Sequence, residues 1–150
     1  MLTPIAAAFA VALSFSAPVP TLADEFPPPV EWSLGVTAIG YQAELDDCHW
    51  TRMDFDGVVP IVGAHNYCGG DIILDMTTGQ IVHLAGGSVD GTYIVTGDRQ
   101  VFPGDDAIQA TAGLSATVML QTCYWDVAQG MRLVTLQPVS AEPRDFSRIA

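Results

Sequence analysis

The chain has 150 residues, of which 49% are hydrophobic and 15% are charged. This length is typical of a single domain, and the apolar share favours a folded core over disorder. The formal net charge is −12, and all five cationic side chains are arginines that do not cluster in the sequence. Binding to nucleic acid or to an anionic lipid surface depends on clustered Lys or Arg, so the composition argues against both kinds of partner.

The chain begins with the pattern of a targeting segment. Residues 1–23 contain an apolar stretch and then small residues that suit cleavage before Asp24. The pattern predicts a secretory signal peptide; the alternative is an uncleaved membrane anchor, which would have to accommodate Pro18 and Pro20. Residues 24–29 form a proline-rich spacer, which favours an extended conformation. We therefore expect a secreted or cell-envelope protein, with membrane association through the N-terminal segment as the alternative.

Short β-rich runs alternate with turn residues from residue 30 to residue 140. This pattern predicts an all-β domain, a closed or partly open β-barrel of about seven to eight strands. Two short helices are predicted, one over Asp105–Ala112 with Asp105 as its N-cap and one near Glu44–Cys48. Residues 141–150 are predicted to be a polar tail. The predicted strands are Trp32–Ala38, Val58–Ala64, Asp71–Met76, Gln80–Ala85, Gly91–Val95, Ser115–Thr122 and Met131–Pro138.

Three cysteines in an exported chain leave one without a partner inside the molecule. The candidate disulfides are Cys48–Cys68, Cys68–Cys123 and Cys48–Cys123. A bond between Cys48 and Cys68 would close a loop of about 20 residues, stabilise the fold by roughly 3 kcal/mol and leave Cys123 free. A bond between Cys68 and Cys123 would instead remove Cys123 as a nucleophile. A free exported thiol is a nucleophile, an intermolecular link or a buried inert side chain.

Three chemically capable side chains stand at the ends of apolar runs. Cys123 ends the run that begins at Met119, His65 follows Pro60–Ala64, and Arg132 opens the run that continues to Val134. An adjacent imidazolium or guanidinium favours the thiolate, which is the nucleophilic form of cysteine. Strands that are distant in sequence meet at one rim of a barrel. We therefore expect Cys123, His65 and Arg132 to lie together.

These runs resemble motifs of the sortases, exported cysteine transpeptidases that join proteins to the cell wall. Val62–Asn66 is similar to the strand-ending histidine motif of that family, and Leu120–Cys123 is similar to its "TLxTC" strand. Met131–Val134 looks like the arginine-led strand, and Asp90–Val95 looks like the "Y-x-V" strand. The resemblance covers about Val36 to Val139, and its motifs occur in the family's order.

The resemblance implies a thioacyl mechanism. Cys123 would attack the carbonyl of a threonine in a sorting signal, His65 would act as acid and base, and Arg132 would donate hydrogen bonds to the oxyanion. The implied partners are a protein substrate that carries a sorting motif and an amine acceptor, and no cofactor is implied. The alternative from another class is a non-catalytic secreted β-barrel domain that binds a protein or cell-wall component, with Cys123 buried or disulfide-bonded.

The other candidate sites have weaker patterns. Cys48-His49 and His65-x-x-Cys68 offer zinc ligand types without a finger spacing. Asp54-Phe55-Asp56 lacks the later ligands of a calcium loop. His83 alternates with apolar neighbours, so we expect it to face outward from a strand. The pair Asp46-Asp47 is expected to lie in a solvated turn.

Overall fold

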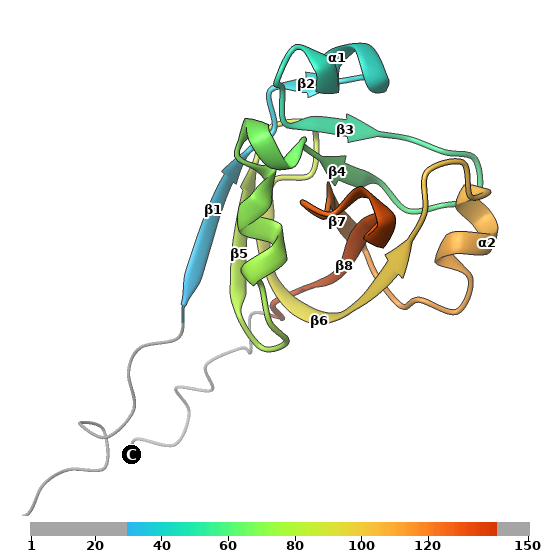
Figure 1. Cartoon of the computed structure of the whole chain (residues 1–150). Coiled ribbons are helices and arrows are strands. Elements are labelled where there is room, and N and C mark those ends of the chain that lie inside the picture. The colour runs from blue at the N-terminus through green and yellow to red at the C-terminus, as the bar shows by residue number, and fades with distance from the viewer. Residues whose placement is uncertain (1–29, 141–150) are drawn as a thin grey trace, which may run out of the picture.

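The computed structural model describes residues 30–140, so the predicted signal peptide, spacer and tail (1–23, 24–29 and 141–150) lie outside the described residues. The described part is an eight-stranded sheet that curls into a partly open barrel and carries short helices (Figure 1), which confirms the predicted all-β class. The strands are β1 (Glu31–Gly35), β2 (Ala38–Ile39), β3 (Thr51–Met53), β4 (Ile61–Gly63), β5 (Ile81–Ala85), β6 (Gly91–Val101), β7 (Val118–Cys123) and β8 (Met131–Pro138). The helices are α1 (Gln42–Asp46) and α2 (Ala107–Thr111), with 3₁₀ turns η2 (Asn66–Cys68), η3 (Gly70–Asp75) and η4 (Val127–Gln129).

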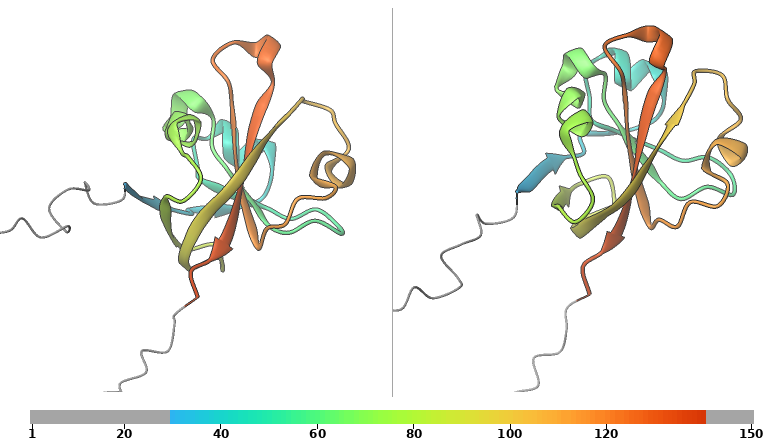
Figure 2. Two further views of the ribbon diagram at one scale, coloured as in Figure 1. Left: turned by 90° about the horizontal axis from the view of Figure 1, so that it is seen from below. Right: turned by 60° about the horizontal axis from the view of Figure 1, so that its bottom comes forward.

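Two consecutive strands form the two edges of the sheet. The strand order is β1-β5-β6-β8-β7-β4-β3-β2, with β1 parallel to β5 and β2 parallel to β3. The two residues between β1 and β2 bond beside both edges: the Val36 N–H donates to Ala85 O at the end of β5 (2.8 Å), and the Thr37 N–H donates to Trp50 O just before β3 (2.9 Å). The chain therefore brings the edges together and curls the sheet, as the two views in Figure 2 show.

The crossing between the edges needs a residue without a side chain. Gly86 has φ +91°, and a Cβ on it would collide with the carbonyl oxygen of Val36. Arg52 reinforces this junction, since its Nη1 donates to Gly87 O at 2.9 Å. The Gly86-Gly87 pair thus allows the close approach that completes the barrel.

Strands β4, β7 and β8 bury side chains on both faces. Successive residues of a strand point to opposite faces, so each strand contributes to two clusters. The inner face carries the larger cluster, which includes Val62, Leu120 and Val134. The outer face carries Ile61, Met119 and Leu133, covered by residues from α1 and from the segment around α2. The remaining core residues of the two clusters include Ile73, Met76, Val82, Val95, Val118 and Leu136 on the inner side and Leu45, Met53 and Val101 on the outer side.

The predicted strand Asp71–Met76 is wrong, because this segment forms the 3₁₀ turn η3. Gly70, Ile73 and Met76 are all buried and lie three residues apart, which matches the three-residue repeat of a 3₁₀ helix rather than the two-residue repeat of a strand. Its β-branched residues suggested a strand, but burial at every third position decides the conformation.

Other elements begin or end at residues that differ from the predicted ones. The predicted strand Gly91–Val95 is too short, because β6 continues through Gly97 to Val101 with an irregularity between Val95 and Gly97. The N-cap of α2 is Asp106 rather than Asp105, since the Asp106 carboxylate accepts from the Gln109 N–H at 3.0 Å. Strand β3 was not predicted; it is only three residues long.

Gly70→Ala tests the packing that follows His65. A Cβ at Gly70 would meet the carbonyl oxygen of Ala64 and lie 2.8 Å from both His65 O and Thr122 Oγ1. We expect the free energy of unfolding to fall by about 1–3 kcal/mol, the usual cost of overpacking, in urea denaturation followed by circular dichroism. Gly35→Ala is the matched control, because nothing lies within 4 Å of its Cβ. Equal stability of the two variants would contradict the packing described.

Candidate active site

The pairing of β4 with β7 brings His65 and Cys123 to one end of the sheet. Gly63 is in register with Gln121 in this parallel pair, so two residues further along His65 lies opposite Cys123. The strands stay together beyond the last paired residues, since Thr122 Oγ1 donates to Ala64 O at 2.9 Å. His65 has an extended backbone (φ −62°, ψ 145°). Alternation then places His65 and Cys123 on the same outer face as Gly63 and Gln121.

His65 and Cys123 line one small pocket on that face. Gln42, Leu45, Gln121 and Met131 also line it. Gln42, Leu45, Met53, Gln121 and Met131 also line a larger groove of about 380 Å³, so the pocket and the groove adjoin each other.

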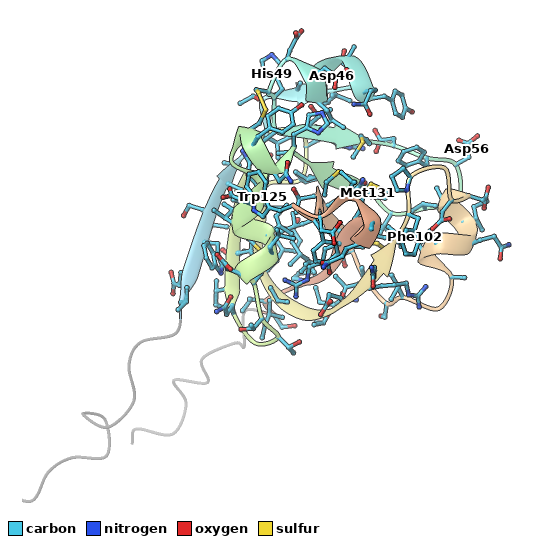
Figure 3. The ribbon with its side chains drawn as sticks, in the orientation of Figure 1. Asp46, His49, Asp56, Phe102, Trp125 and Met131 are labelled. Carbon is cyan, nitrogen blue, oxygen red and sulfur yellow. A yellow bond between two sulfur atoms is a disulfide. The ribbon has the colours of Figure 1, made fainter. Side chains whose placement is uncertain are left out.

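The groove is mainly apolar and runs over the outer cluster toward α2. Its side chains include two aromatic residues in edge-to-face contact, Tyr41 and Phe55, with ring centroids 5.6 Å apart. Phe102, which is 47% exposed, lines it from the end of β6, and Met131 lines it from the start of β8 (Figure 3). A groove of this kind suits an extended peptide with apolar side chains, one end of which would lie beside the thiol of Cys123.

The His65 ring is held by a carboxylate. Its Nε2 lies 2.9 Å from Oδ1 of Asp46, the last residue of α1, and the ring stacks on Tyr67 with centroids 4.9 Å apart. Asp46 also accepts from Gln42 Nε2 at 2.7 Å. The hydrogen bond from His65, followed by that from Gln42, lowers the pKa of the Asp46 carboxyl below its usual value. The site therefore contains a thiol, an imidazole and an ionised carboxylate.

Cys48 and Cys68 form a disulfide, which leaves Cys123 as the free cysteine of the described residues. The alternative bond between Cys68 and Cys123, which would remove the nucleophile, is not formed. Cys48 follows α1 and Cys68 ends η2, so the bridge joins the segment that carries Asp46 to the segment that follows His65.

The thiol of Cys123 is partly buried beside apolar side chains. Burial raises the pKa of the Cys123 thiol above its usual value. This differs from the sequence expectation, in which neighbouring cations favour the thiolate. The difference follows from the surroundings: Leu45, Met53 and Met131 line the pocket, and no arginine does.

The structure does not bring Arg132 to the pocket. In the antiparallel pair of β7 and β8, Cys123 is in register with Met131, and Arg132 is in register with Thr122. Residues directly opposite each other point to the same face. Arg132 therefore shares the inner face with buried Thr122, while Cys123 and Met131 share the outer face.

The guanidinium of Arg132 is occupied by backbone oxygens. It donates to the carbonyls of Ile73, Leu74 and Met76 at 2.7–2.9 Å, and it pairs with the Asp98 carboxylate at 3.3 Å. Its side chain is 12% exposed. Arg132 thus binds carbonyl groups in the last turn of η3, which have no strand partner. These contacts hold η3 against the sheet.

Asp46 and the groove residues are the site components that the sequence reasoning missed. Asp46 was expected to be a solvated turn residue, and its carboxylate is indeed 59% exposed, but one oxygen faces His65. The available signal was the spacing of the cysteines, because Cys48 lies shortly after Asp46 and Cys68 shortly after His65. A bond between those cysteines brings the segments that carry Asp46 and His65 next to each other.

The other candidates lie outside this pocket. His83 faces out from β5 and bonds to Glu31 and Thr92 at 3.1 Å each. His49 Nδ1 lies 3.0 Å from Thr37 Oγ1. Asp54 pairs with Arg52 at 2.9 Å. Within residues 30–140, no three His, Cys, Asp or Glu side chains are placed to hold a metal ion.

Comparisons with known proteins find similarity among solved structures. No protein-family model matches the chain, and no curated protein matches it. Sortase C from Clostridium perfringens SM101 aligns with a TM-score of 0.47 and 18% identity over 65% of this chain and 58% of that one. Sortase A from Corynebacterium diphtheriae aligns with a TM-score of 0.48 and 18% identity over 71% of this chain and 55% of that one. The chain thus spans somewhat more than half the length of each sortase, and the likeness concerns the fold alone.

Arg132→Lys tests the structural role of this arginine. A lysine ammonium cannot reproduce the planar fork that serves three carbonyls and Asp98. We expect the free energy of unfolding to fall by about 1–3 kcal/mol because polar groups lose their partners, with little change in the alkylation rate of Cys123. Arg52→Lys is the comparison variant, because the Arg52 guanidinium serves one carbonyl, that of Gly87, and one carboxylate, that of Asp54. Unchanged stability with a slower thiol reaction would contradict this placement.

The pH dependence of Cys123 alkylation tests the state of the thiol. Because burial raises the pKa of Cys123, the thiolate fraction at neutral pH is smaller than that of an exposed cysteine. We expect the rate with iodoacetamide to rise with pH to a midpoint above that of a cysteine peptide, and to match the peptide in denaturant. A midpoint below that of the peptide would show a preformed thiolate instead.

Proposed function

We propose that the protein is a sortase-like cysteine acyltransferase, which cleaves a peptide bond through a thioacyl intermediate on Cys123 and transfers the acyl group to an amine. The observation that carries this proposal is the shared pocket of Cys123 and His65 at one end of an apolar groove. A nucleophile and a base on one face, with a carboxylate on the base, form a constellation suited to nucleophilic catalysis.

In the proposed reaction the thiol is neutral until the substrate binds. His65 takes the proton from Cys123 as the sulfur attacks the substrate carbonyl, and it returns the proton to the departing amine. The incoming amine then attacks the thioester carbonyl and passes its proton to His65. His65 returns that proton to the departing sulfur, so Cys123 is again a neutral thiol and His65 is again a neutral base. The raised pKa of Cys123 supports this order, because the protein favours the neutral thiol at rest.

The oxyanion donor in this proposal is Gln121 rather than Arg132. Gln121 lies two residues before Cys123 on the same face of β7 and lines the same pocket. Its Nε2 donates to the thioether sulfur of Met131 at 2.7 Å, and a thioether is a weak acceptor. A charged oxygen would be a better acceptor for the same amide, so the donor can change partners at low cost when the intermediate forms.

The partners and compartment are part of the proposal. The groove favours a protein segment with apolar residues before the reacting carbonyl, and the second substrate is an amine. A location outside the cytoplasm is compatible with the Cys48–Cys68 disulfide, since disulfides persist in oxidising compartments. None of the helices in residues 30–140 is long and apolar enough to span a membrane.

A second candidate function is a non-catalytic exported domain that binds a protein segment in the same groove. The placement of Arg132 on the inner face favours it, because the expected cationic donor is absent from the pocket. The two functions differ in whether the groove's occupant becomes attached to Cys123.

Covalent trapping separates the two functions. The protein is incubated with hexapeptides randomised at each position, with or without glycylglycine, and its intact mass is measured. We expect an acyl adduct on Cys123 that disappears on addition of glycylglycine with formation of an extended peptide. Cys123→Ala should abolish the adduct. Gln121→Ala should lower the rate of adduct formation by about 10²-fold, the usual loss for one oxyanion donor.

Two controls make the trapping result specific. His83→Ala alters a histidine outside the pocket and should leave the rate unchanged, whereas His65→Ala should reduce it by about 10²–10⁴-fold. Peptide retained without any adduct, equally by wild type and Cys123→Ala, would favour the binding domain and contradict the acyltransferase.

A further inference from the structure

We propose that Asp46 is a positioning residue, which orients the His65 ring toward Cys123, and that the Cys48–Cys68 disulfide holds this pair in place. The inference deepens the proposed acyltransferase function and rests on it. Asp46 itself does not line the pocket that contains Cys123 and His65, so it acts through the ring of His65.

The hydrogen bonds around Nε2 indicate which ring nitrogen carries the proton. Nε2 of His65 lies 2.9 Å from the Asp46 carboxylate, which only accepts, so the close contact requires a proton on Nε2. Gln42 Nε2 is farther from the ring, at 3.4 Å, and directs its own proton to Asp46 at 2.7 Å. Nδ1 has no hydrogen-bond partner among the described residues. The neutral ring is therefore held as the tautomer whose free lone pair is on Nδ1, available to accept a proton.

The ring is held on its face as well as at its edge. Tyr67 stacks on His65 with a centroid separation of 4.9 Å and an interplanar angle of 12°. The stack limits rotation of the ring, and the Asp46 contact selects one of its two flipped orientations. Only 17% of the His65 side chain is exposed, although Asp46 is accessible on its other side.

The disulfide explains how a short helix can hold Asp46 in position. Helix α1 has five residues, too few to be stable alone. Leu45 anchors it in the outer cluster, and the disulfide fixes the chain just after Asp46 to the turn just after His65. The Cα atoms of Cys48 and Cys68 are 5.2 Å apart. Two crosslinks, one covalent and one hydrogen-bonded, thus join the same two segments.

The charge on Asp46 persists at neutral pH. The hydrogen bond from His65 is the main cause that lowers the pKa of Asp46, so the carboxylate is ionised throughout the neutral range. The nearby titratable groups on its own segment are Glu44, Asp47 and His49. The titratable groups on the neighbouring segments are His65, just before η2, Tyr67, within η2, and Cys123, at the end of β7.

The first test measures turnover in the full chain. With the peptide found by trapping, we expect Asp46→Asn to lower kcat by about fivefold, as for loss of an exposed ion pair, with little change in KM. Asp46→Glu should recover part of the loss, and the loss should be uniform across neutral pH and narrow only in acid that protonates the wild-type carboxylate. Glu31→Gln is the matched control, because it breaks a comparable His–carboxylate contact of 3.1 Å at His83, outside the pocket.

The second test does not depend on activity. In ¹³C NMR of the carboxyl groups, His65→Ala should raise the pKa of Asp46 toward its usual value, and Gln42→Ala should raise it less. An unchanged Asp46 titration in His65→Ala would overturn the positioning role even if Asp46→Asn is too unstable to assay. Wild-type turnover with equal kcat in Asp46→Asn and Glu31→Gln would also overturn it while the acyltransferase function stands. No turnover by the wild type would refute the acyltransferase, and the NMR result would still decide whether Asp46 and His65 are coupled.

Discussion

The register of β7 with β8 decides what the candidate site can contain. Cys123 lies opposite Met131, and Arg132 lies opposite Thr122. Because side chains alternate between faces, the thiol points to the small pocket on the outer face and the guanidinium points to the inner side of the barrel. The register cannot shift by one residue without moving fully buried Leu120 and Val134 out of the inner cluster. The packing of the core therefore separates Cys123 from Arg132, and the polar side chains that share the pocket with the thiol include His65, Gln42 and Gln121.

Arginines in the described part of the chain share a structural task. Arg52 donates to Gly87 O, Arg99 donates to the carbonyls that end α2, and Arg132 donates to the carbonyls that end η3. Each of these carbonyl groups lies in a segment between two strands, where no neighbouring strand can donate a hydrogen bond to it. A guanidinium offers several donors in a fixed plane, so one side chain can hold a whole turn. Through Arg99 this also fixes the wall of the groove formed by α2, which links a scarce residue type to the shape of the site.

Sequence reasoning succeeded where a short pattern determines the outcome. Alternating apolar residues and turn dipeptides indicated the strands, and strand ends predicted that His65 and Cys123 would meet. It failed for Arg132 because the face of that residue depends on the pairing across the β7–β8 hairpin, which no local pattern encodes. It failed for Asp71–Met76 because β-branched residues there serve a 3₁₀ turn whose carbonyls are held by Arg132. Asp46 was missed because its role arises from a disulfide whose pairing the spacing left open.

The two halves of the proposed site are held by different forces. Cys123 ends β7, a strand flanked by β4 and β8, so the sheet and both apolar clusters hold the thiol. His65 and Asp46 lie outside the sheet, on a 3₁₀ N-cap and a five-residue helix, and a covalent bridge joins their segments. Reduction of that bridge would leave the nucleophile in place and loosen the pair that must take its proton. The bridge therefore contributes to the position of the proposed base, whereas the position of the thiol depends on the sheet alone.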